Sequence, residues 1–310
     1  MKKKECRFCS SLYLFVLFFL CIADVNAETQ VSILTSTPSP AAVYTLWGHT
    51  AIRVKTDSTD NVYNYGVFMF DEGFVYKFVK GETDYWVEHE PYASARSIAV
   101  YKNVYLYEQV LNLTEEQAVG IARALLENEK HENRFYRYNY FYDNCATRVR
   151  DIVERYSNIA YPPIQNTTTY RDEIHSLVSE NPWLSFGIDL CLGSKADEIV
   201  DGRALMFLPC KMMQIFDEAR LENGENIVKE KKKLVVPIMY DAVETVAITP
   251  SVVAWMLFFL ILAYTLMQLR VNSSNVIFDC VMFIAYGLLG TLIAFLVFVS
   301  EHPCTSLFTS

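Results

Sequence analysis

Apolar and polar residues alternate along much of the first half of the chain, which is typical of strands with one face in a core. Residues 49–55 alternate in this way. The segments that follow are rich in valine, tyrosine and phenylalanine, with glycines between them. The pattern predicts strands at 49–55, 61–70, 74–79, 84–88 and 97–111.

Helical spacing of the apolar positions replaces this alternation from residue 113 onward. Residues 113–117 resemble a capping box, and Ala118, Ile121 and Leu125 continue them as one apolar stripe. A second helix begins after Asp143 or Asn144, with its inward face at 145, 149, 152, 153 and 156. Further helices are predicted at 169–178, 182–190 and 206–221. Together these elements predict an α+β domain, with a largely antiparallel sheet and helices gathered on one side.

Three longer apolar segments lie outside this domain. The first follows three N-terminal lysines and ends at Ala27, and its apolar core is too short to span a membrane, so residues 1–27 are expected to be a cleaved secretory signal. Two others, at about 250–269 and 276–299, are long enough to cross a bilayer and form a hairpin with Arg270 at its tip. We therefore predict an exported domain at 28–244 and a membrane hairpin with a short tail at 245–310.

The net charge of the chain limits which kinds of binding partner are expected. The whole chain is 52% hydrophobic and carries 27 basic and 36 acidic residues. Removal of residues 1–27 takes away four basic and two acidic residues, which leaves a net charge of −11. An acidic exported domain lacks the clustered cations that neutralise phosphates of DNA or RNA, so nucleic acid is not an expected partner. Arg270 is expected on the cytoplasmic side of the membrane.

Five cysteines remain after residue 27: Cys145, Cys191, Cys210, Cys280 and Cys304. Cys191 and Cys210 flank a compact stretch in an oxidising compartment, so either a disulfide or two buried thiols fits them. Cys145 has no evident partner, and an unpaired thiol in an exported protein is a candidate reactive group.

Cys145 also lies at a position that favours a reactive thiolate, the first turn of a predicted helix. The unpaired amides and the positive end of the helix dipole stabilise a thiolate there. Backbone N–H groups at Asn144 and Ala146 are candidate donors to the oxyanion of a tetrahedral intermediate. By position alone, Cys145 also fits a small buried residue of the core.

A thiolate nucleophile usually has a histidine within hydrogen-bond reach. His49 stands at the head of a predicted strand after Trp47 and Gly48, where Trp47 can exclude water, and we predict it as the base. Asn64, on the next predicted strand, is the candidate that orients the imidazole. The alternative for His49 is a hydrogen-bonded core histidine.

Candidate substrate contacts come from cations and aromatic residues. Arg53 and Arg148 are suited to a phosphate or to pairing with acidic residues. Trp47, Tyr65 and Tyr142 belong to aromatic stretches that would line an acyl-chain site or pack on a sheet. No two histidines or cysteines have the spacing of metal ligands, and no phosphate-cradling glycine loop occurs, so neither a metal nor another cofactor is expected.

Several motifs carry a resemblance to a known family: WGHTAIRV, YNYGVF, KFVKGETDYWV, LNLT, YNYFYDNCATRVRDIV, TTTYRDEI, NPWLSFGIDLCLG and FLPCKMM. In these the chain resembles bacterial lipoprotein N-acyltransferases of the Lnb type, which are common in Bacteroidetes. More distantly, a histidine strand followed by an Asn-Cys helix is similar to permuted, papain-like thiol enzymes of the cell-wall peptidase and lecithin retinol acyltransferase type.

The resemblance implies an acyltransferase of the bacterial inner membrane with its catalytic domain in the periplasm. An acyl chain would pass from a phospholipid donor, through a thioester on Cys145 with His49 as base, to the α-amino group of a diacylated lipoprotein. Two other functions fit the residues: an exported thiol peptidase or amidase of the cell wall, and a non-catalytic, membrane-tethered domain that binds lipid.

Overall fold

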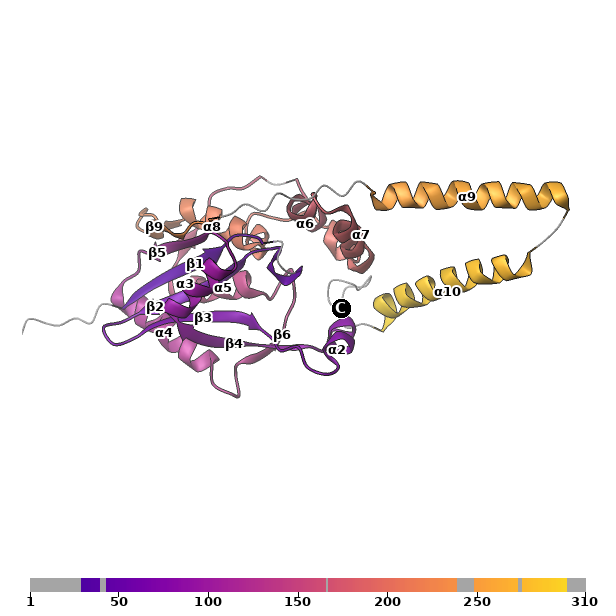
Figure 1. Cartoon of the computed structure of the whole chain (residues 1–310). Coiled ribbons are helices and arrows are strands. Elements are labelled where there is room, and N and C mark those ends of the chain that lie inside the picture. The colour runs from indigo at the N-terminus through magenta and orange to yellow at the C-terminus, as the bar shows by residue number, and fades with distance from the viewer. Residues whose placement is uncertain (1–28, 40–42, 166, 239–247, 273–274, 300–310) are drawn as a thin grey trace, which may run out of the picture.

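Seven strands form one antiparallel sheet at the centre of the domain (Figure 1). The computed structural model describes residues 29–39, 43–165, 167–238, 248–272 and 275–299. In spatial order the strands are β6 (Phe135–Arg137), β4 (Asp84–Pro91), β3 (Asp60–Val67), β2 (His49–Lys55), β1 (Gln30–Ser36), β5 (Leu106–Leu111) and β9 (Val228–Val235). Two short strands, β7 (Ile159–Ala160) and β8 (Arg220–Leu221), pair separately.

Helices cover both faces of the sheet. Against one face pack α4 (Glu115–Asn128), α5 (Cys145–Tyr156) and α8 (Pro209–Glu218), which enclose the larger apolar core with Ile33, Ile52 and other inward strand residues. On the opposite face, α3 (Tyr92–Tyr101) packs through Ala95 and Ala99 on a smaller cluster. The predicted α+β class is confirmed, but the expectation that the helices lie on one side is wrong because α3 covers the other face.

Two segments predicted as strands contain helices. Residues 74–79 belong to α2 (Phe74–Lys80), which lies between Gly73 and Gly81, both in left-handed backbone conformations. The stretch 97–111 divides into the end of α3, a left-handed turn at Asn103, and β5. α2 is rich in valine and aromatic residues, whose preference for strands is overridden there by the flanking turns, whereas α3 carries three alanines, which favour a helix.

Five strands lie outside the predicted set: β1, β6, β7, β8 and β9. β1 pairs with both β2 and β5, so it occupies the middle of the sheet. β9 holds the lysine run 229–233 on an edge of the sheet, with most of its side chains exposed. Lysines on an edge strand discourage pairing with other chains, which explains why this strand carries a charge run.

The second half of the chain follows the predicted helices closely. α5 begins after Asn144, α6 spans Tyr170–Val178 and α7 spans Pro182–Cys191. The stretch 206–221 divides into the end of the short helix η3 (Ala204–Phe207), the helix α8 and the strand β8. A second short helix, η2 (Ser194–Asp197), follows α7, and η1 (Val43–Thr45) precedes β2.

The two apolar C-terminal segments form the helices α9 (Pro250–Val271) and α10 (Val276–Phe298). At 1.5 Å per residue each is about 33 Å long, enough for the ~30 Å hydrocarbon core of a bilayer. None of their residues in the apolar windows is buried in the protein. Figure 1 shows the pair projecting from the side of the domain that carries α2, α6 and α7. The predicted signal at 1–27, and Cys304, lie outside the described residues.

Candidate active site

Cys145 is the first residue of α5, and its place is set by a capping box one residue earlier. The Asn144 side chain accepts hydrogen bonds from the amides of Ala146 and Thr147, at 2.8 and 2.9 Å, while Thr147 Oγ1 accepts from the Asn144 amide. Asn144 Nδ2 also donates to the carbonyls of Tyr140 and Phe207. The start of the helix is therefore fixed from both sides, and the Cys145 thiol is held at it.

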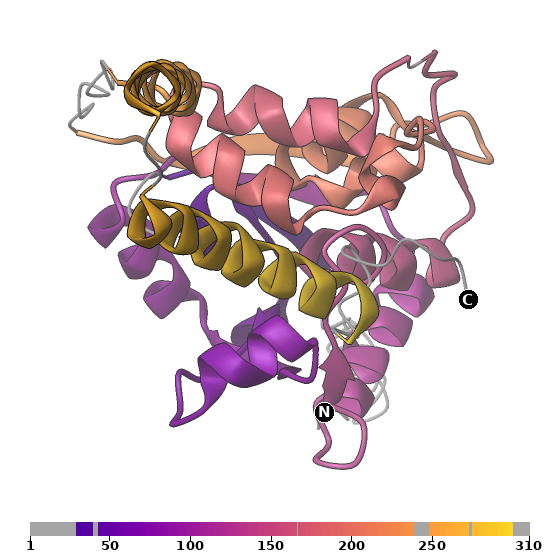
Figure 2. The same ribbon diagram turned by 90° about the vertical axis from the view of Figure 1, so that its right-hand side faces the viewer.

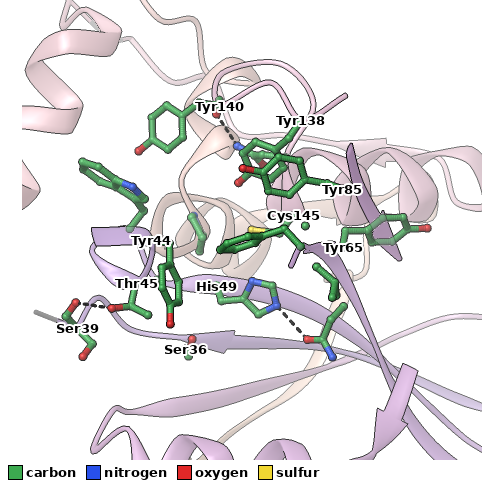
Figure 3. Close-up of a pocket in the computed structure, with 18 of the residues that line it drawn as sticks. Ser36, Ser39, Tyr44, Thr45, His49, Tyr65, Tyr85, Tyr138, Tyr140 and Cys145 are labelled. Carbon is green, nitrogen blue, oxygen red and sulfur yellow. Dashed lines mark hydrogen bonds between the residues drawn. The ribbon is translucent and has the colours of Figure 1, made fainter. Parts of the chain in front are cut away.

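His49 opens β2 after a tight turn at Gly48. Gly48 has φ +76°, and a Cβ there would lie 2.5 Å from the carbonyl oxygen of Ser36, so no larger residue fits. The turn starts β2 opposite the end of β1, with His49 in register with Ser36. The imidazole of His49 and the thiol of Cys145 lie adjacent in one cavity (Figure 3), close enough for each to shift the pKa of the other.

The two groups shift each other's pKa values in the directions that favour an ion pair. Burial raises the pKa of the Cys145 thiol, but the charge of His49 and hydrogen bonds from His49, Thr50 N–H and Tyr138 outweigh it, so the pKa lies below its usual value. Burial lowers the pKa of His49, yet the charge and hydrogen bond of Cys145 raise it above its usual value overall. Both shifts move the pair towards a thiolate and an imidazolium.

Asn64 fixes which nitrogen of His49 faces the sulfur. Asn64 Oδ1 lies 3.0 Å from His49 Nε2, and Asn64 Nδ2 donates to Glu90 Oε1 at 3.1 Å. With the amide nitrogen bound to a carboxylate, the amide oxygen faces the ring, so Nε2 carries the proton. Nδ1 is then the nitrogen available to Cys145.

Glu90 was not among the predicted site residues. It lies on β4, where Glu88 is directly opposite Asn64, so Glu90 is the diagonal neighbour on the same face. The sequence around it, EHEP, reads as an acidic turn. Only the register between β3 and β4 brings its carboxylate to Asn64.

The amides predicted to hold an oxyanion are already occupied. Asn144 N–H donates to Thr147 Oγ1, and Ala146 N–H donates to Asn144 Oδ1, because the capping box uses both. Thr50 N–H and the Tyr138 hydroxyl lie beside the Cys145 sulfur and lower the pKa of its thiol, so these two groups are alternative candidate donors. The pairing of β2 with β3 begins at Ala51, and thus leaves the Thr50 amide directed to the sulfur.

Tyr138 reaches the sulfur from the aromatic stretch that precedes α5. Its ring lies 4.7 Å from that of Tyr85, measured between centroids, and it packs over Gly66, where an added Cβ would be 3.1 Å from Tyr138 Cε2. Burial, first of all, raises the pKa of Tyr138, and the negative charge of Cys145 adds to this, so the phenol keeps its proton and donates. Figure 3 shows Tyr138 beside Cys145, on the side away from His49.

The predicted substrate contacts divide into two groups. Trp47 and Tyr65 line the cavity at Cys145, although the Tyr65 hydroxyl accepts from Asn128 and only 1% of the residue is exposed. Arg53, Arg148 and Tyr142 do not line it.

Ion pairs and packing explain the second group. Arg53 is bound to Asp60 and Glu108 beneath the ring of Tyr92, and Arg148 is bound to Asp143 against Tyr136. Tyr142 packs on Phe141 and Tyr170 instead. The structure therefore places these three side chains away from the cavity, and for Arg53 and Arg148 it shows the alternative, pairing with acidic residues.

Cys191 and Cys210 are both free thiols, so the disulfide alternative is not realised. Cys191 ends α7 in the cavity wall, whereas Cys210 lies in the first turn of α8. Burial raises the pKa of each of the two thiols. Within the described ranges no group of three or more His, Cys, Asp or Glu side chains is placed to hold a metal ion.

The dyad opens into a cavity of about 1070 Å³, just above the ~300–1,000 Å³ usual for small-molecule sites. Much of its wall is aromatic or aliphatic. Lys102 is the one lysine or arginine among the described residues that line it, and its charge lowers the pKa of His49 slightly. A nucleophile–base pair in an apolar chamber is suited to acyl transfer in which water must be kept away.

Comparisons with known proteins match two parts of the chain. Residues 22–177 match the Lnb N-terminal periplasmic domain, and residues 242–308 match the Lnb transmembrane domain. No curated protein matches significantly. No solved structure does either, so the papain-like likeness stays a hypothesis.

Proposed function

The chain belongs to the Lnb family, as an inner-membrane protein with a periplasmic N-terminal domain, and from this membership and the geometry at Cys145 we propose that it is a cysteine acyltransferase. The donor is a membrane phospholipid, and the acceptor is the free α-amino group of a diacylated lipoprotein. The observation that carries the proposal is an adjacent Cys–His pair inside a large apolar cavity that extends to a membrane helix.

The first half-reaction forms a thioester. His49 Nδ1 holds the proton of Cys145, and the thiolate attacks an ester carbonyl of the donor. Thr50 N–H and the Tyr138 hydroxyl, which contact the sulfur in the free enzyme, are placed to donate to the oxyanion on the adjoining carbon. The C–O bond then breaks, and the proton on His49 passes to the departing lysophospholipid oxygen.

The second half-reaction releases the acyl chain as an amide. The neutral α-amine attacks the thioester carbon, and His49 removes the proton of the amine. The C–S bond breaks, the amide leaves, and the proton returns to the Cys145 sulfur. Exclusion of water by the apolar wall prevents hydrolysis of the thioester between the two steps.

Lys102 replaces Arg53 and Arg148 as the cation for the donor's phosphate. It lies in the cavity wall close enough to His49 to influence its pKa, whereas the two arginines are held by carboxylates. A lysine binds phosphate as a point charge and tolerates several headgroups.

The two rival functions fit the cavity less well. A thiol peptidase of the cell wall needs a polar groove for its peptide, but most of this wall is apolar. A non-catalytic lipid-binding domain needs neither a thiol with a lowered pKa nor a histidine held in one tautomer.

Intact-mass analysis of the full chain with phospholipid vesicles tests the proposal. The wild type is expected to gain the mass of one acyl chain, and hydroxylamine is expected to remove it, because thioesters are labile to this amine. Cys145→Ser is expected to gain no hydroxylamine-labile mass. Absence of an adduct on the wild type with any lipid, in the presence or absence of acceptor, would contradict the acyltransferase function.

Removal of the Asn64 amide is expected to slow thioester formation by about 10- to 100-fold, because His49 loses the group that fixes its tautomer and angle. Glu90→Leu is expected to act in the same direction by freeing the Asn64 amide to rotate. Glu90→Gln keeps an oxygen for Asn64 Nδ2 to donate to and serves as the matched control. Rates of adduct formation with Asn64→Ala, Glu90→Leu and Glu90→Gln check this, and equal rates in all three would contradict it.

A further inference from the structure

The cavity at Cys145 extends away from the sheet between two helices that carry apolar side chains but bury few of them. On one side lie Phe68, Phe70 and the α2 residues Phe74 and Phe78, with ring centroids 4.5–5.7 Å apart along the series. Phe70 and Phe78 are nevertheless 68% and 44% exposed. Exposed, contiguous aromatic side chains on a soluble domain mark a surface that binds something apolar.

The facing helix, α7, has the same character. Its sequence, PWLSFGIDLC, is mostly apolar, yet none of its residues is buried. Trp183, Leu184, Gly187 and Ile188 form its part of the cavity wall. An apolar helix with no buried residue is explained if its inner side meets an apolar ligand.

The membrane hairpin meets the domain at this place. Trp183 Nε1 donates to the carbonyl oxygen of Ile248 at 2.7 Å, just before α9 begins, and Leu296 near the end of α10 lines the cavity. In Figure 2, α10 crosses between α7 and α2, and in Figure 1 its C-terminal end lies beside both helices. The outer end of the cavity is therefore at the membrane surface.

Gly187 is the cavity-lining position on α7 that carries no side chain. A Cβ added there would have no atom within 4 Å. Glycine in the middle of a helix is disfavoured relative to nearly every other residue. Its presence at a cavity-lining position, beside larger apolar residues, keeps the cavity wide where a side chain would narrow it.

We propose that one long fatty acyl chain of the donor phospholipid lies between α2 and α7, enters from the bilayer beside α10, and is admitted because position 187 is glycine. This inference rests on the proposed function, because it places the acyl chain of the same reaction. With the chain in this slot, its ester carbonyl lies at the Cys145 sulfur and its headgroup remains outside the slot.

The slot is tested by comparing a long-chain and a short-chain donor, dipalmitoyl and dibutyryl phosphatidylcholine, with the full-length protein. Adduct formation on Cys145 is measured by intact mass. Gly187→Trp is expected to slow acylation by the dipalmitoyl lipid at least tenfold and to change acylation by the dibutyryl lipid by less than about threefold. Gly187→Leu is expected to give an intermediate loss with the long chain, since leucine is smaller.

Leu190→Trp is the matched control, because residue 190 lies on the same helix but does not line the cavity. It is expected to leave acylation by both donors unchanged. Equal slowing of both donors by Gly187→Trp, or no slowing of either, would overturn the slot while leaving thioester chemistry intact. Lack of an adduct on the wild type with both donors would instead overturn the proposed function.

Discussion

Replacing Cys145 with alanine is expected to lower the rate of acyl transfer by at least about 10⁴-fold, because the proposed covalent intermediate forms on its sulfur. His49→Ala is expected to lower it by about 10²- to 10⁴-fold, the usual contribution of a general base. If both residues serve one step, the double variant is no slower than Cys145→Ala alone. Radiolabelled acyl transfer to a lipoprotein acceptor gives all three rates.

The His49→Ala variant is also expected to change the pKa of the Cys145 thiol. Without the imidazolium, burial remains as the strongest influence on Cys145, so the pKa of its thiol rises. The thiolate fraction at neutral pH then falls. The midpoint of the pH dependence of alkylation by a small reagent is expected to lie at a higher pH than in the wild type. A pKa that is unchanged in His49→Ala, or additive losses in the double variant, would separate the two residues functionally.

Glu108→Ala is expected to lower the free energy of unfolding by about 1–3 kcal/mol, because it leaves a buried donor of Arg53 without an acceptor, while Asp60 still binds the rest of the guanidinium. Arg53 Nη1 lies 2.7 Å from Glu108 Oε1, and the side chains are only 9% and 2% exposed. Since desolvation of the pair is costly, Glu108→Leu combined with Arg53→Met is expected to recover most of the loss. Urea unfolding of the detergent-solubilised chain measures both.

A surface ion pair on the same sheet supplies the control. Glu230 binds Lys232 on the edge strand β9, with side chains 55% and 43% exposed, so Glu230→Ala is expected to leave the urea midpoint of unfolding unchanged. The Glu108 result also separates two roles for Arg53. Unchanged stability with lost acylation would show that Arg53 binds substrate, whereas the expected result makes it a structural residue.

Features that depend on a few adjacent residues could be predicted from the sequence. The start of α5 is such a feature, because Asn144 and Thr147 satisfy its amides within four residues. The two membrane helices depend only on the length of an apolar run, and the strand that carries His49 depends on local alternation. These local signals were enough to identify the thiol, the histidine and the membrane attachment.

Partners that come from distant segments could not be predicted in this way. Arg53 faces Glu108 because β1 lies between β2 and β5, and Glu90 reaches Asn64 because of the register of β4. Thr50 N–H is directed at the sulfur because the pairing of β2 with β3 begins one residue later, at Ala51. Each of these depends on strand order or register, which one chain's pattern does not specify.

The sequence by itself determined three local features of this protein: a cysteine at a helix start, a histidine at a strand start, and two helices long enough for a bilayer. Only the tertiary structure decided what surrounds the cysteine and the histidine, from Thr50 and Tyr138 beside the sulfur to the apolar cavity wall of α2 and α7. The physical reason is the separation along the chain between the residues that interact. Caps and apolar lengths are fixed by neighbours along the chain, whereas the environment of a buried side chain is fixed by whichever strands and helices fold against it.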